Sequence, residues 1–218
     1  VAGTCRAAEK QADFARRGVE ALLFESDRLL VESAFEGVTH VLQSIPPGAE
    51  GDPVLAMHGA MLARRRQIRW FGYLSTTGVY GDRGGDWVEE HDDLQPTGER
   101  GRRRVAAEVG WSRLLYAEGL PLHVFRLAGI YGPGRSALDS LRAGTAKRVI
   151  KPGQVFSRIH VADIVQVLRA SMARPNAGAV YNVCDDDPAP PWEVVEYAAE
   201  LLGIPAPPAV PFEQAELS

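Results

Sequence analysis

The sequence predicts an α/β protein with a doubly wound parallel sheet, on three observations. Short apolar runs of strand length alternate with longer segments of helical periodicity along most of the 218 residues. Glycine and proline separate the two kinds of segment. One apolar run, residues 68–74, ends in the hydroxyl residues Ser75, Thr76 and Thr77. Because the carboxyl ends of strands in an open parallel sheet face a crevice, this is where a ligand site is expected.

The first half of the chain supplies most strands of the expected sheet. Gly18 ends the first helix, since glycine accepts the left-handed conformation that follows a helix. Pro46 and Pro47 close the third strand, because proline cannot continue a hydrogen-bonded ladder. The expected strands are residues 1–4, 21–24, 40–43 and 68–74, and the expected helices are residues 9–17, 29–35 and 54–65.

The second half continues the alternation with longer helices. A long helix is expected over residues 98–118, and further helices over residues 161–173 and 191–202. Residues 122–126 and 180–183 are the corresponding strands. The chain therefore carries the strand-and-helix alternation that right-handed crossovers build into a parallel sheet.

Composition excludes several classes of protein. With 45% hydrophobic and 24% charged residues and a net charge of -4, the chain is typical of a globular domain and implies no nucleic-acid partner. Cys5 and Cys184 lie too far apart in sequence for a metal motif or a disulfide framework, which favours a reducing cytoplasm and no bound metal. No apolar run approaches the ~20 residues needed to span a bilayer, so no membrane association is expected.

Five motifs, in their order along the chain, resemble the nucleotide-sugar epimerase/dehydratase branch of the extended short-chain dehydrogenase/reductase superfamily. They are the segments 75–81 (STTGVYG), 106–108 (AAE), 125–134 (FRLAGIYGPG), 158–164 (RIHVADI) and 181–183 (YNV). The resemblance implies a Rossmann-like fold that binds NAD or NADP and acts on a nucleotide sugar or a small carbonyl compound.

The resemblance also implies a division of the chain. Residues 1–134 correspond to the cofactor-binding domain, and residues 135–218 mainly to a small substrate-binding portion, with residues 160–184 returning to the first domain's sheet. Family members open with a strand, a glycine-rich turn and a helix that hold the cofactor pyrophosphate. Residues 1–4 correspond to the family's second strand, so the first βα unit is absent from this sequence.

A second departure concerns the chemistry on the long helix. Family enzymes carry a Tyr and a Lys four residues apart, and here Arg100 and Arg104 occupy those positions. A guanidinium stays charged at any working pH, so Arg100 could bind an anionic substrate but could not exchange a proton as a phenol does. Arg104 could still donate to a ribose hydroxyl. Alternatively, Arg100, Arg104 and Glu108 form an exposed ion-paired face.

The resemblance assigns the hydroxyl residues after the fourth strand to the reacting end of the site. Thr76 aligns with the family's catalytic Ser or Thr, which would polarise the substrate oxygen at the carbon that exchanges hydride. Thr77 is a second substrate contact. Ser75 lies along the cofactor or packs at the strand end, and Tyr80 is expected to pack or shape the loop.

The expected cofactor contacts follow the ends of successive strands. An Arg after the second family strand would favour a 2′-phosphate, so Arg6 predicts NADP in preference to NAD. The other expected cofactor contacts are Glu25, Ser44, Ile45, Pro46, Leu127 and Ile130.

The expected substrate contacts lie in the later half of the chain. Lys151 and Arg158 are the expected contacts to anionic groups, and His160 is expected to be structural because Asp163 can fix it. Trp87, in a glycine-rich acidic loop, either covers a ligand or anchors that loop.

Three functions remain open. The first is an NADP-linked epimerase, dehydratase or reductase; the second is a non-catalytic NADP sensor or scaffold; the third is a structural domain with a vestigial crevice. A homodimer through the long helix is a further possibility that the resemblance implies.

Overall fold

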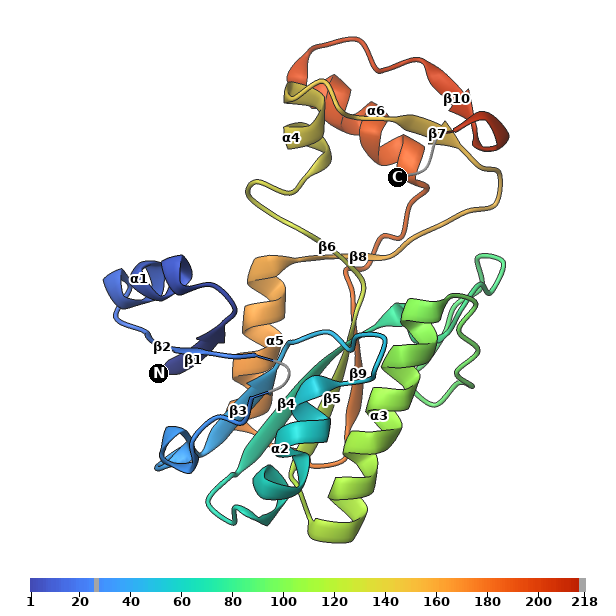
Figure 1. Ribbon diagram of the computed structural model, residues 1–218. Helices are drawn as coiled ribbons and strands as arrows, with labels where there is room; N and C mark the ends of the chain where they lie inside the picture. Colours follow the sequence, from blue (N-terminus) through green and yellow to red (C-terminus); the bar gives the residue numbers. More distant parts are fainter. Residues whose placement is uncertain (26–27, 216–218) are drawn as a thin grey trace.

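The main sheet is four-stranded and parallel. The computed structural model describes residues 1–25 and 28–215. The sheet has the order β3 (His40–Gln43), β4 (Trp70–Thr76), β5 (Leu122–Leu127) and β9 (Val180–Val183), as Figure 1 shows. These bounds lie within two residues of those expected from the sequence, and the predicted α/β class with parallel sheets is confirmed.

Helices cover both faces of this sheet. Helices α2 (Pro53–Arg64) and α3 (Glu99–Glu118) pack on one face, where Phe71 and Tyr73 of β4 point into the core. Helix α5 (Val161–Ala173) covers the opposite face. The alternation of side chains along β4 produces this division, because neighbouring residues of a strand point to opposite faces.

The first strands form a separate unit. Strands β1 (Ala2–Cys5) and β2 (Glu20–Leu23), joined by α1 (Ala8–Arg16), form their own two-stranded parallel sheet. No strand of this sheet pairs with the main sheet in the described residues. A single continuous sheet, as a doubly wound fold requires, is therefore interrupted between β1–β2 and β3.

One expected helix is shorter than the sequence suggested. Residues 29–35 were expected to be helical, but only the 3₁₀ turn η1 (Glu32–Phe35) forms. Its side chains explain the difference, since no residue of η1 is buried and a short helix without a buried face has little to stabilise it. Phe35 still packs on the ring of buried His58, at 5.7 Å between ring centres.

A second lobe stands beyond the sheet in Figure 1. It consists of α4 (Ala137–Arg142), β7 (Arg148–Ile150), α6 (Pro191–Leu202) and β10 (Ala209–Pro211), with β10 parallel to β7. Two short paired strands, β6 (Gly129–Tyr131) and β8 (Arg158–His160), connect this lobe to the sheet. No helix in the described part of the chain is long and apolar enough to cross a membrane.

Candidate functional site

Thr76 is the last residue of β4 and lies beside the end of β5, where it is in register with Leu127. Its hydroxyl oxygen accepts a hydrogen bond from the backbone N–H of Gly78, at 3.1 Å, and so caps the 3₁₀ turn η2 (Thr77–Val79). A hydroxyl that accepts one bond can still donate its own hydrogen. Thr76 and Thr77 are both half-buried, so a ligand at the strand ends could reach them.

The first turn of α3 packs directly on this turn. A Cβ added at Gly101 would lie 2.7 Å from the carbonyl oxygen of Gly78 and 2.8 Å from Cβ of Pro96. Only glycine permits so close an approach. Since Arg100 precedes Gly101 and is exposed, its side chain starts from a point beside the Thr77–Gly78 turn.

Arg104 braces the strand that carries Thr76. Its Nη1 donates to the carbonyl oxygen of Leu74 and, at 3.3 Å, to the hydroxyl of Tyr73. The guanidinium also lies 5.7 Å from the centre of the Tyr73 ring. Arg104 therefore already donates hydrogen bonds to two groups of β4, which leaves fewer N–H groups for a ligand.

Tyr73 on β4 supplies no phenol that a ligand at the strand ends could reach. Burial raises the pKa of Tyr73 to about 12, against the opposing influence of Arg104. Its side chain is fully buried. At neutral pH the phenol is protonated and out of reach of a ligand at the strand ends.

Ser75 belongs to a buried polar network. Its hydroxyl donates to Glu108 on α3, and the other carboxylate oxygen of Glu108 accepts from Arg126 Nη2 on β5 at 2.9 Å. Arg126 Nη1 also donates to the hydroxyl of Tyr80 at 2.7 Å, and Tyr80 donates to Asn182 on β9 at 2.7 Å. The network joins α3 to strands β4, β5 and β9, near the carboxyl end of each strand.

The charges in this network compensate one another. The Arg126 and Glu108 side chains are only 6% and 7% exposed. Burial disfavours the charged guanidinium, but the hydrogen bond and the negative charge of Glu108 outweigh it and raise the pKa of Arg126. A buried ion pair with satisfied hydrogen bonds is a rigid support for the residues above it.

The loop that contains Glu90 is hydrogen-bonded to the same network and to β9. Arg126 Nη1 donates to the backbone carbonyl of Glu90 at 2.9 Å, and the Glu90 carboxylate accepts from the backbone N–H of Asn182 at 2.8 Å. Trp87, three residues earlier, is 77% exposed. Glu90 therefore anchors the loop, while Trp87 does not pack into the protein.

Most of the predicted cofactor residues follow the ends of strands β1, β2 and β3, whereas Leu127 is the last residue of β5 and Ile130 lies within β6. Arg6, Glu25, Ser44 and Pro46 are exposed, Ile45 and Ile130 are half-buried, and Leu127 is buried. The backbone N–H of Ile45 donates to the side chain of Gln43 at 2.7 Å, which fixes the turn after β3.

Arg158 and Lys151, the residues predicted to contact anionic groups of the substrate, both contact other groups of the protein. Arg158 Nη1 donates to the backbone carbonyls of Phe156 at 2.9 Å and Ala189 at 3.0 Å. Burial lowers the pKa of Arg158. The Lys151 ammonium lies 4.7 Å from the centre of the Phe212 ring. Among the described residues, no contact brings Lys151 or Arg158 to Thr76. His160 accepts from the backbone N–H of Ala162 and caps α5.

Sequence reasoning assigned no role to Arg126 or Asn182, although both lie within the quoted motifs. The available signal was a charged residue inside an otherwise apolar strand. Such a residue is rarely buried without a partner.

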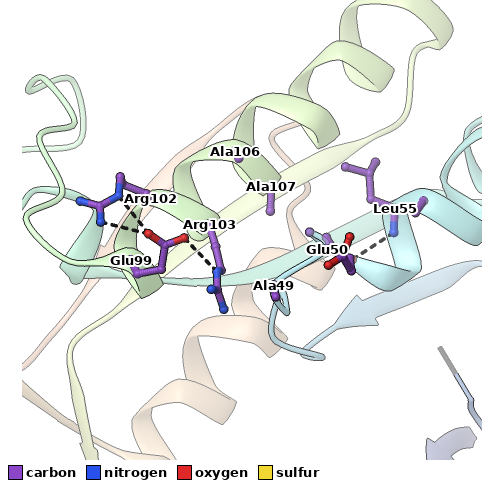
Figure 2. Close-up of a pocket in the computed structure, with 11 residues that line it drawn as sticks. Ala49, Glu50, Leu55, Glu99, Arg102, Arg103, Ala106 and Ala107 are labelled. Carbon is purple, nitrogen blue, oxygen red and sulfur yellow. Dashed lines mark hydrogen bonds and ion pairs between the residues drawn. The ribbon is translucent and has the colours of Figure 1, made fainter.

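A groove lies beside this site. It has a volume of about 530 Å³ and runs between residues 49–56, at and before the start of α2, and the first half of α3 (Figure 2). Glu99, on its rim, pairs with Arg102 at 3.0 Å and with Arg103 at 3.2 Å. None of the site residues predicted from the sequence lines this groove. In the described residues, no group of three His, Cys, Asp or Glu side chains could hold a metal ion.

Comparison with solved structures gives chains that are similar to this one. A functionally unknown conserved protein from Silicibacter pomeroyi is 55% identical, with a TM-score of 0.89 over 99% of this chain and 74% of that chain. The dTDP-glucose 4,6-dehydratase of Bacillus anthracis, solved in complex with NAD, has a TM-score of 0.77 at 18% identity, over 94% of this chain and 72% of that chain.

A curated relative matches part of the chain. Protein YeeZ of Escherichia coli strain K12 is 31% identical over 137 residues, which are 62% of this chain and 47% of YeeZ. The match thus spans about half the length of that relative. No protein-family model matches the sequence.

Proposed function

We propose a dinucleotide-linked function for this chain, which belongs to the same family as the conserved Silicibacter pomeroyi protein and has the fold of the epimerase/dehydratase structures of the extended short-chain dehydrogenase/reductase superfamily. The proposed protein binds NADP, in preference to NAD, and acts on a nucleotide sugar or a small carbonyl compound. The observation that carries the proposal is the position of Thr76, half-buried at the end of β4 and beside the first turn of α3.

The proposed chemistry divides the work between Thr76 and Arg100. When bound, the nicotinamide would supply or accept hydride. The Thr76 hydroxyl would donate to the substrate oxygen at the carbon that changes oxidation state, and so polarise it. Arg100, exposed beside the same turn, would hold an anionic group of the substrate. A guanidinium cannot exchange protons at neutral pH, so the proton would come from water or from the substrate itself.

The cofactor preference rests on Arg6. This residue is exposed directly after β1, where a guanidinium can pair with a ribose 2′-phosphate. Glu25, Ser44, Ile45 and Pro46 would line the rest of the dinucleotide.

The substrate would extend toward the second lobe. Lys151 and Arg158 are the proposed contacts to its anionic part, and Trp87 is free of the core to cover it. A homodimer through α3 completes the proposal, supported by Val109 and Tyr116 of that helix, which are 45% and 86% exposed.

A second candidate function is a non-catalytic NADP-binding sensor or scaffold. The bonds of Arg104 to Leu74 and Tyr73 favour it, because they give this residue a structural task in place of the family's proton relay.

The Thr76→Val variant tests the enzymatic proposal, because valine keeps the shape of threonine and removes the hydroxyl. Turnover of nucleotide sugars such as dTDP-glucose would be measured together with NADPH binding. We expect unchanged NADPH affinity and a loss of turnover of about 100-fold, the usual scale for a lost polarising donor. Thr97→Val, exposed and outside the site, is the matched control. NADPH binding without turnover of any carbonyl substrate would support the sensor, and absence of NADPH binding would contradict both.

A further inference from the structure

A second cavity lies on the side of α3 opposite the groove in Figure 2. It has a volume of about 340 Å³, and its walls come from α3, from strands β5 and β9, and from the loop that leads into α3. Arg103 lines the groove and Ser112 lines the cavity. Nine residues of an α-helix make about two and a half turns, which places these two side chains on opposite sides of α3. None of the site residues predicted from the sequence lines the cavity, so it is distinct from the crevice at the strand ends.

Glu108 and Arg126 form the base of the cavity, and their hydrogen bonds leave one donor over. Both side chains are more than nine-tenths buried. A guanidinium has five N–H groups. Arg126 uses Nε and one hydrogen of Nη2 for Glu108, and it uses Nη1 for Tyr80 and for the carbonyl of Glu90. The remaining N–H, on Nη2, has no acceptor among the residues that the structure describes. It is available to an oxygen atom in the cavity.

Arg113 supplies a positive charge at the same cavity. Its side chain is exposed on α3 and makes no hydrogen bond or ion pair within residues 1–25 and 28–215. Since Glu108 neutralises Arg126, the charged residues that line the cavity have a net positive charge, which comes from Arg113. This balance favours an anion. A carboxylate fits, because it accepts two parallel hydrogen bonds from a guanidinium.

The remaining walls of the cavity are largely apolar. Val124 of β5 is buried, and Val180 of β9 and Leu94 of the loop are half-buried. Tyr116 is 86% exposed at the α3 wall, where its ring can lie against a flat ligand. A mostly apolar lining with a few polar groups is typical of sites that bind small organic molecules.

We propose that this cavity binds a small organic carboxylate with an apolar, preferably aromatic, body. The carboxylate pairs with Arg113 and accepts the remaining N–H of Arg126. The apolar body lies between α3 and strands β5 and β9, against Val124 and Val180. This site is independent of what the crevice at the strand ends binds.

The edge of β9 favours a small ligand over a peptide strand. In the described residues β9 is the last strand of the main sheet and pairs only with β5. An open edge is ordinarily a template for another strand. Here the backbone N–H of Asn182 already donates to the Glu90 carboxylate, and the Asn182 side chain donates to the carbonyl of Val88 at 3.4 Å. The loop therefore covers this part of the edge, while the cavity beside Val180 stays open.

Titration with 3-phenylpropionate tests the proposal, because this probe joins a carboxylate to an apolar ring. The backbone amides would be followed by NMR, with 3-phenylpropanamide as the uncharged probe of the same shape. We expect saturable shifts at Val109, Ser112 and Val180, with a Kd of about 1 mM or tighter. The amide should bind about tenfold more weakly, because it lacks the charge that pairs with a guanidinium.

Matched variants locate the probe. Arg113→Gln removes a charge at an exposed position and is expected to weaken binding of the carboxylate by about tenfold or more, the scale of one lost charge-assisted hydrogen bond. Arg169→Gln, exposed on α5, is the control and should bind as the wild type does. Ser112→Leu places a larger side chain in the cavity and should abolish binding of both probes without lowering the Tm.

Three results would overturn the proposal. The first is equal affinity for the two probes, or an affinity that Arg113→Gln leaves unchanged. The second is a set of shifts centred on Thr76 and Arg100, which would place the probe in the crevice at the strand ends. The third is the absence of saturable shifts. Because Val109 and Tyr116 also carry the proposed dimer, a dimer that Tyr116→Ala dissociates would then identify a second copy as the occupant.

Discussion

Glu108 and Arg126 form a buried ion pair, 2.9 Å between carboxylate and guanidinium, that joins the long helix α3 to the central strand β5. Removing one partner of such a pair leaves an uncompensated charge in the core, which typically costs about 3–5 kcal/mol. We therefore expect Glu108→Ala to lower the free energy of unfolding by roughly that amount in urea titrations.

Glu99, on the same helix, is the matched control for this prediction. It pairs with Arg102 and Arg103, but at the exposed start of α3. Exposed pairs contribute little to stability, so Glu99→Ala is expected to unfold close to the wild-type midpoint. Equal effects of the two substitutions would show that the buried pair has no special role.

Tyr80→Phe tests the link between this pair and β9. The substitution removes the hydroxyl that accepts from Arg126 and donates to Asn182, and leaves the Asn182 oxygen without that donor. An unsatisfied buried polar group costs about 1–3 kcal/mol, and because Asn182 is only half-buried, we expect a loss of stability toward the lower end of that range. Tyr116→Phe, at an 86% exposed position, should have no effect. A stable Tyr80→Phe variant would mean that water replaces the hydroxyl.

Gly101→Ala tests the close contact between α3 and the turn after Thr76. A Cβ would lie 2.7 Å from the backbone oxygen of Gly78, which is part of the 3₁₀ turn η2 and cannot move without disturbing that turn. Overpacking of this kind costs about 1–3 kcal/mol, and ligand binding at the strand ends should weaken with it. Gly98→Ala is the control, because its Cβ would meet no atom within 4 Å. If Gly101→Ala keeps the wild-type stability and ligand affinity, α3 does not pack against Gly78 as closely as described.

The lowered pKa of buried His123 sets the direction in which we expect stability to change with pH. Burial lowers the pKa of this residue from 6.5 in the folded state. The unfolded chain therefore binds the proton more readily, so the contribution is complete above about pH 6.5 and is lost as the pH falls below it. The buried ring accepts from the N–H of Asn176 at 2.9 Å and contacts the carbonyl of Pro121 at 3.0 Å.

Urea unfolding at pH 7.5 and 5.5 checks this dependence. We expect the wild type to be less stable at pH 5.5, and His123→Gln to be less stable at both values but with a smaller difference between them. Exposed His91 serves as the control, and His91→Asn should keep the wild-type difference. An unchanged difference in His123→Gln would place the pH sensitivity in another group, such as His58, whose pKa burial also lowers.

The sequence predicted the elements with a clear period and missed those without one. The helices at 161–173 and 191–202 match α5 and α6, because each has a continuous apolar face. The three-residue strands β6 and β8 are too short to show alternation, and only their mutual pairing defines them. The separation of β1–β2 from β3 is likewise a property of pairing between distant segments, which local patterns do not carry.

The candidate site shows the same limit. The hydroxyl residues at the end of a strand located the tip of β4 from sequence alone. The partners of Ser75 and Tyr80 could not be found in this way, because Glu108 and Arg126 come from a different helix and strand. Arg104 was placed on the correct helix, but its bond to the Leu74 carbonyl depends on the packing of α3 against β4.

Titration of the complete protein with NADPH and with NADH tests the central claim most directly. The account predicts that NADPH binds at least about tenfold more tightly than NADH, a difference of about 1.4 kcal/mol, and that Arg6→Ala removes this preference. Binding of neither dinucleotide, or a preference for NADH that Arg6→Ala leaves unchanged, would contradict it.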